Sequence, residues 1–184
     1  MKKLLASVFL TLTALCGGVS HACVGKTIHV GIITSGERLL AEMASLMISE
    51  RTGSTVKIDV YRDTNELYAA VKQGKVNIIL ENTERAADVL AKAKGAPVIG
   101  YDAIKSEYRK TFNMTWLESI GGAPQYAPVL TMETLSNYPA LPKLLNKLAG
   151  ALQNNTYARM VHADDPEDRA RKSAKDFLKS RKLI

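Results

Sequence analysis

Apolar residues recur along this chain in two alternating patterns. Short runs rich in valine and isoleucine, bounded by glycine, serine or threonine, are typical of buried strands. Longer stretches in which apolar residues return every three or four positions are typical of helices with one apolar face. The first pattern predicts strands over residues 27–33, 55–61 and 76–80, and the second predicts helices over 37–49 and 65–72. This β-α-β-α-β order predicts a parallel sheet with right-handed crossovers and helices on both faces.

The second half of the chain adds further elements and then becomes helical. Helices are predicted over residues 83–92 and 101–111, and strands over 114–119 and 126–130. A segment capped by Thr131 or Ser136 follows, then a helix with a leucine stripe over 141–148, and a last helix that begins at Asp165 and Pro166. No repeat and no linker interrupts the pattern. The sequence therefore predicts a single three-layer α/β lobe with a mostly parallel, roughly five-stranded sheet and a C-terminal helical segment.

Residues 1–22 have the features of a secretory signal peptide, with two early lysines, a short apolar stretch and small residues before an expected cut after Ala22. The apolar stretch is too short to span a bilayer as a mature helix. Residues 23–184 then form the mature lobe, which we expect to be periplasmic or otherwise extracytoplasmic. Acylation of Cys23 is an alternative, although Ser20 stands where a lipidation motif has an aliphatic residue.

The charge balance is only mildly basic. The chain has 25 Lys and Arg against 18 Asp and Glu, a net charge of +7 that becomes +5 when residues 1–22 and their two lysines are removed. This balance does not indicate a nucleic-acid partner. A chain of this length buries roughly 70% of its unfolded surface, which is enough for a full core.

Four stretches together carry a resemblance to a known family. They are TIHVGIITSGERLLAEM at 27–43, TGSTVKIDV and TNELYAAVKQGKVNIILENT within 52–83, YDAIKSEYRKTFNMTWLESIG at 101–121, and YPALPKLLNKLAG with DFLKSRKLI towards the end. In this order they are similar to the substrate-binding proteins of ABC importers for glycine betaine, choline and other osmoprotectants. That family belongs to the type 2 periplasmic binding proteins, which have two lobes.

The resemblance implies that the second lobe is missing. In this family the chain builds most of one lobe, crosses to build the second, and returns to finish the first. Here only 17 residues, 121–137, separate the outgoing crossing from the return, and residues 126–129 resemble the returning strand. The implied function is that of an extracytoplasmic solute-binding component of an ABC importer for quaternary amines, with an ABC permease as partner and no catalysis.

Candidate ligand-binding residues follow from the predicted sheet. Ligands of open α/β sheets bind outside the carboxyl ends of the strands. These positions are Thr34, Ser35, Gly36 and Glu37 after the first strand, Glu81, Asn82 and Thr83 after the third, and Tyr126 near the return. The helix that opens after the first strand offers N–H groups suited to a carboxylate, although Thr34 and Ser35 also serve as ordinary cap residues.

Two of these loops depart from the family pattern. The family's Glu-Tyr-Thr-Gly becomes Glu-Asn-Thr-Glu at 81–84, and its Asn-Phe-Thr becomes Thr-Ser-Gly at 34–36, so two aromatic residues are absent. A trimethylammonium group favours aromatic faces, and Trp116 and Tyr126 remain as candidates, although a lone tryptophan in a strand is more typical of a core. With one wall of the cleft absent, we expect dissociation constants of about 1 mM.

Other chemistry is poorly supported. The segment GIITSGER at 31–38 lacks the Lys-Ser/Thr of a phosphate-binding loop, and no pairing of a nucleophile with a base can be named. His29 and His162 have no companion ligands at metal spacing. The acidic group at 164–168 is interpreted as a helix start rather than as a calcium site. We therefore predict no enzyme activity, no metal and no cofactor.

A different class of function stays open. The chain is alternatively a degenerate single lobe that serves as a protein-interaction module or pairs with a second copy of itself. Tyr126 and the loop near Glu81 would form that interface.

Overall fold

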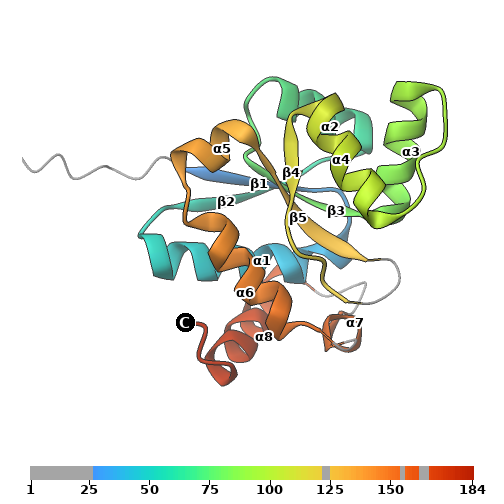
Figure 1. Ribbon diagram of the computed structural model, residues 1–184. Coiled ribbons are helices and arrows are strands. Elements are labelled where there is room, and N and C mark those ends of the chain that lie inside the picture. Colours follow the sequence, from blue (N-terminus) through green and yellow to red (C-terminus); the bar gives the residue numbers. More distant parts are fainter. Residues whose placement is uncertain (1–26, 122–124, 154–155, 162–165) are drawn as a thin grey trace, which may run out of the picture.

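The computed structural model describes residues 27–121, 125–153, 156–161 and 166–184 (Figure 1). The predicted signal peptide at 1–22, Cys23, His162 and the acidic pair Asp164 and Asp165 lie outside the described residues. Within the described ranges, no helix is both long enough and apolar enough to cross a membrane.

Five strands form one mixed sheet in the order β2-β1-β3-β5-β4. The strands are β1 (Ile28–Ile32), β2 (Val56–Val60), β3 (Ile78–Asn82), β4 (Met114–Trp116) and β5 (Tyr126–Thr131). β1 pairs in parallel with both β2 and β3, and β5 runs antiparallel to both β3 and β4. Four strands therefore point the same way and only β5 is reversed, which confirms the prediction of a mostly parallel, five-stranded sheet.

Helices cover both faces of this sheet (Figure 1). They are α1 (Ser35–Thr52), α2 (Thr64–Lys72), α3 (Thr83–Lys94), α4 (Tyr101–Phe112), α5 (Met132–Asn137), α6 (Leu141–Ala151), α7 (Thr156–Met160) and α8 (Glu167–Ser180). One apolar cluster joins a sheet face to α1, α6 and α8, and the second joins the other face to α2, α3 and α4. The predicted three-layer lobe is confirmed.

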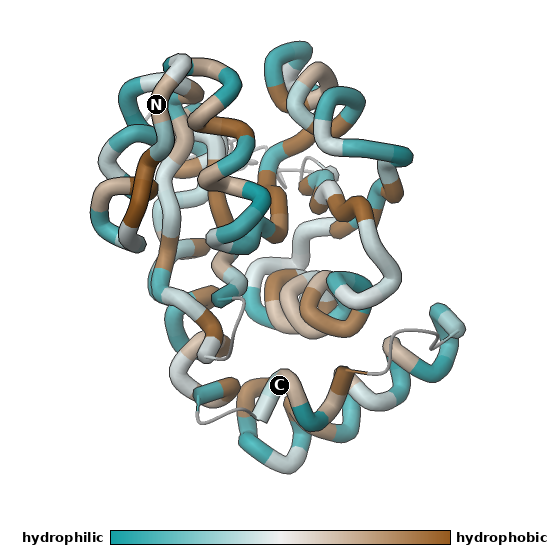
Figure 2. Tube along the Cα trace, turned by 90° about the vertical axis from the view of Figure 1, so that its right-hand side faces the viewer, coloured by the Kyte–Doolittle hydropathy of each residue, from teal (hydrophilic) through white to brown (hydrophobic). Residues whose placement is uncertain are grey.

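On one face of the sheet the helices form two layers, with α1 against the sheet and the C-terminal helices outside α1. Figure 2 shows α1 nearly end-on as a largely apolar helix between the sheet and the C-terminal helices. Its side chains Leu40, Met43 and Ile48 are completely buried. α8 runs along the outer side of α1, where Arg171 Nη1 lies 2.9 Å from a carboxylate oxygen of the buried Glu42. The C-terminal segment is thus part of the lobe's core.

Two predicted strands differ by two or more residues at an end from the observed ones, each for a local reason. β3 begins at Ile78 because Asn77 bonds to His29 through its side-chain oxygen, which accepts the His29 N–H at 2.8 Å. β4 ends at Trp116, since the next position lies opposite Pro128, which accepts a hydrogen bond from Leu117 but has no N–H to donate in return. The short helix α7 was not predicted.

Candidate functional site

Three segments meet at the carboxyl edge of the sheet. Thr34 and Ser35 follow β1 and open α1, while Asn82 ends β3 and caps α3 by accepting the backbone N–H of Arg85 at 2.9 Å. Tyr126 opens β5 as the register partner of Asn82. This edge lies on the right in Figure 1 and faces the viewer in Figure 2. The structure therefore brings the predicted site residues of the first and third strands to one edge with Tyr126.

The two predicted glutamates turn inward instead of facing solvent. Glu37 and Glu81 are both fully buried, and the guanidinium of Arg85 lies between them. Arg85 Nη1 donates to Glu37 Oε1 at 2.6 Å, Nε donates to Glu81 Oε1 at 2.5 Å, and Nη2 donates to the carbonyl of Leu80 at 2.5 Å. Both carboxylates thus belong to an internal network that supports the edge, and they do not offer oxygen atoms to a ligand.

Two tyrosines complete this network on the side of α2 and α4. The hydroxyl of Tyr68 donates to Glu81 Oε2 at 2.6 Å and lies 2.5 Å from the hydroxyl of Tyr108. Burial raises the pKa of Glu81 above its usual value, and the nearby Arg85 opposes that shift. Burial also raises the pKa of Tyr68 well above 10, and the Glu81 charge adds to the effect. Tyr68 therefore remains a neutral donor to Glu81.

The sequence analysis assigned no role to Arg85, Tyr68 or Tyr108. Arg85 stands four residues after Glu81, but Glu81 lies in β3 and Arg85 in the first turn of α3, so the spacing rule for ion pairs on a helix does not predict their contact. Although burial by itself lowers the pKa of Arg85, the charges of Glu81 and Glu37 raise it above its usual value. No signal in the sequence linked Arg85 to Glu37, which lies 48 positions earlier.

The solvent-facing part of the edge consists of the remaining predicted residues. Thr34 and Ser35 are exposed, while Gly36, Thr83 and Tyr126 are half-buried. Tyr126 meets Tyr157 edge-on with ring centroids 5.8 Å apart, and the Tyr157 hydroxyl donates to the carbonyl of Gly36 at 2.7 Å. Tyr126 is thereby held beside the start of α1.

The start of α1 is stabilised by the buried side chain of Glu37 rather than by a side-chain cap. Thr34 occupies the N-cap position but makes no side-chain cap bond. Glu37 Oε2 instead accepts the backbone N–H of Ile33 at 2.9 Å. The side chain of Glu37 thus spans from Ile33 to Arg85, and it ties the first turn of α1 to α3.

Trp116 belongs to the core. Its side chain is 3% exposed and packs edge-on against Tyr101 and Tyr108, with ring centroids 5.7 and 5.2 Å apart. Among the described residues its indole nitrogen has no hydrogen-bond partner. Of the two aromatic candidates for a cation, only Tyr126 lies at the surface of the edge.

The connection from β4 to β5 confirms the single lobe. The two strands are antiparallel neighbours, and residues 117–125 join them directly. Ile120 donates its N–H to the carbonyl of Tyr126 at 2.7 Å, which extends the pairing into the connection. The chain therefore turns back at the point where a second lobe would begin.

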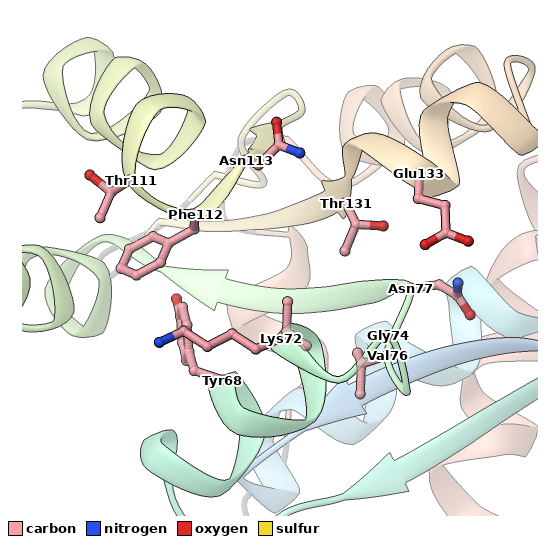
Figure 3. A pocket seen from close by; sticks show the side chains of 11 residues that line it. Tyr68, Lys72, Gly74, Val76, Asn77, Thr111, Phe112, Asn113, Thr131 and Glu133 are labelled. Atoms are coloured by element: carbon pink, nitrogen blue, oxygen red, sulfur yellow. The ribbon is translucent and has the colours of Figure 1, made fainter.

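A hollow lies at each of two opposite edges of the sheet. One of about 400 Å³ adjoins the carboxyl edge between α3 and α4, where Thr83, Ile99, Tyr101 and Gln125 form part of its wall. Another of about 300 Å³ lies at the opposite edge, between Phe112 and the residues around Gly74 (Figure 3). The second hollow contains none of the predicted site residues.

No metal centre is evident in the part of the chain that the structure describes, since no group of three His, Cys, Asp or Glu side chains is arranged to hold an ion there. His29 instead pairs with Asp59, with Nδ1 2.6 Å from Oδ2. Glu167 and Asp168 lie in the first turn of α8, where acids interact favourably with the helix dipole.

Comparison with known proteins places this fold in a family. Residues 26–134, more than half of the chain, match the substrate-binding domain of ABC-type glycine betaine transport systems. Among curated proteins, no sequence match was found. A solved structure described as a glycine betaine/carnitine/choline ABC transporter is similar with a TM-score of 0.70 at 15% identity, covering 86% of this chain and 99% of that chain.

A second solved structure, apo YehZ from Escherichia coli, also gives a TM-score of 0.70, at 14% identity, and covers 87% of this chain and 100% of that chain. At such identities the two structures support the fold alone. The match over residues 26–134 carries the assignment, and the chain therefore belongs to the family of substrate-binding domains of ABC-type glycine betaine transport systems.

Proposed function

We propose that this lobe binds a small quaternary amine at its carboxyl edge, without catalysis, as the extracytoplasmic component of an ABC importer. Residues 1–22 would be removed as a signal peptide, which fits a family that acts outside the cytoplasm. Ser35, Gly36, Thr83 and Tyr126 would contact the solute. Glu37, Glu81 and Asn82 would hold these residues in position.

The position of Tyr126 is the observation that carries the proposal. Burial raises the pKa of its hydroxyl, and the charge of Glu37 raises it further, with smaller contributions in the same direction from Glu84 and Glu81. Arg85 is the cation that opposes them. An aromatic ring held half-buried beside the start of α1 suits a cation that cannot donate hydrogen bonds. A betaine carboxylate would then face the N-terminus of α1.

Replacing Tyr126 tests this proposal. We expect glycine betaine to bind with a dissociation constant of about 1 mM, or about −4 kcal/mol, because only one wall of the cleft is present. Tyr126→Leu should weaken binding about threefold to tenfold through loss of the ring face, while Tyr126→Phe, the matched control, should retain it. Isothermal titration calorimetry with glycine betaine, choline and carnitine measures both effects. If none of the three ligands bound at concentrations of tens of millimolar, the proposal would be wrong.

A second candidate function is pairing with another copy of the chain. Ile99 is 86% exposed and forms part of the hollow that also includes Thr83 and Gln125 at the carboxyl edge. An apolar side chain in such a position is typical of a contact surface. A partner copy placed there would cover the edge that the second lobe covers in two-lobed relatives.

Sedimentation equilibrium tests the pairing. If the carboxyl edges pair, the dimer should dissociate at least tenfold more readily in Ile99→Ser. Lys179→Ser is the control, since Lys179 is exposed in the last turn of α8, away from the carboxyl edge. A monomer at all concentrations up to about 1 mM would exclude this function.

A further inference from the structure

A third hollow lies far from the carboxyl edge, at the opposite end of α1. It has a volume of about 200 Å³ and is formed by the last turns of α1, by α6 and by the residues that follow α8. α1 has 18 residues, so its two ends are about 27 Å apart at about 1.5 Å per residue. A ligand in this hollow would therefore not touch the site proposed for the quaternary amine.

The walls divide into an apolar part and a cationic part. The apolar side chains are those of Met47, Leu144 and Leu183, and the cationic ones are those of Arg51, Lys143 and Lys147. Met47 is 1% exposed and belongs to the main core, against which the two leucines also pack. The hollow is thus continuous with the core on one side and carries positive charge on the other.

The three cations come from two neighbouring helices and line the same hollow. Lys143 and Lys147 stand one helical turn apart on α6 and therefore project from the same side. Arg51 is fixed by two hydrogen bonds, in which Nε and Nη2 donate to the carbonyl of Leu183 at 3.0 and 2.8 Å. Its guanidinium is therefore positioned beside the hollow without a ligand.

These three charges are uncompensated within the part of the chain that the structure describes. No carboxylate lines the hollow, and neither Arg51 nor either lysine forms an ion pair with a described residue. Three other arginines of the described residues do have such partners: Arg38 pairs with Glu167, Arg85 with Glu37 and Arg171 with Glu42. Like charges held near one another repel, and a bound anion would remove that repulsion.

We propose that this hollow binds an amphiphilic anion, with its carboxylate or phosphate at Arg51, Lys143 and Lys147 and its alkyl chain against Met47, Leu144 and Leu183. The volume corresponds to about seven groups the size of a water molecule, at about 30 Å³ each. A chain of about six to eight carbons fits that space. A free medium-chain carboxylate and the head group of an anionic phospholipid offer the same chemistry.

Octanoate is the probe for the test, with octanol and acetate as ligands that carry only the tail or only the charge. Backbone amide shifts over residues 140–152 in NMR titrations should report octanoate binding at least tenfold tighter than either fragment. Lys143→Gln combined with Lys147→Gln should weaken octanoate binding at least tenfold. Lys172→Gln combined with Lys175→Gln removes the same charge from the exposed face of α8 and should leave binding unchanged.

Vesicles distinguish the source of the anion. Binding to phosphatidylglycerol vesicles that octanoate competes away, together with no binding to phosphatidylcholine vesicles, supports a lipid head group. Octanoate binding without vesicle binding supports a free carboxylate. Equal affinities for octanoate and octanol, or equal octanoate affinities in the two double variants, would overturn the proposal.

Discussion

Arg85→Met is expected to lower the free energy of unfolding by about 3–5 kcal/mol at pH 7, because it leaves buried carboxylates without their cation. Glu37 and Glu81 are fully buried, and Arg85 is the ion-pair partner of both. Methionine keeps a comparable volume, so loss of charge accounts for most of the effect. Urea denaturation measures it, with Arg109→Met as the control, since Arg109 is exposed and forms no ion pair among the described residues.

The decrease in the free energy of unfolding caused by Arg85→Met should become larger as pH rises. The pKa of Glu81 is already raised by burial, and removal of the opposing Arg85 charge should raise it further. A carboxyl whose folded-state pKa lies above its unfolded value contributes stability at low pH, and this contribution is lost as pH rises through the folded-state pKa. The difference between variant and wild type should therefore be smallest near pH 5 and grow towards pH 8. An equal difference at both pH values would contradict this account of the network.

The fold was largely predictable from local patterns. β1 and α1 were recognised because a β-branched run and a helical apolar stripe are each long enough to identify an element. The absence of a second lobe followed from the short segment after β4, and the direct connection to β5 confirms it. The helix α7, with five residues, was missed because one turn is too short to display an apolar period.

The candidate site was predictable in position but not in orientation. The parallel pairing of β1 and β3 places Thr34 and Asn82 at one edge, as the sequence pattern implied, and Tyr126 joins them because β5 runs antiparallel to β3. Sequence alone cannot tell whether a carboxylate that follows a strand faces solvent or turns inward. For Glu37 the deciding contact is Arg85, which is distant in sequence and reaches it only through the packing of α3 beside α1.

Gly31→Ala is expected to lower the free energy of unfolding by about 1–3 kcal/mol through overpacking. Gly31 lies in β1 between β2 and β3, and a Cβ there would come 2.5 Å from Leu67 Cδ1 and 3.1 Å from Val76 Cγ1. Both side chains are buried, so neither can move into solvent. The added carbon should push α2 outward, and Tyr68, which adjoins Leu67 in α2, should then lose its short contact with Glu81.

Gly150→Ala is the matched control for Gly31→Ala, because nothing lies within 4 Å of the Cβ that it would introduce. Gly150 is in α6, where alanine is favoured over glycine by about 1 kcal/mol, so the control should stabilise the lobe or leave it unchanged. Thermal unfolding gives the sign of each effect, and near-ultraviolet circular dichroism reports whether Tyr68 has moved. If Gly31→Ala proved as stable as Gly150→Ala with an unaltered tyrosine signal, close packing of α2 on β1 would not be what positions Tyr68 against Glu81.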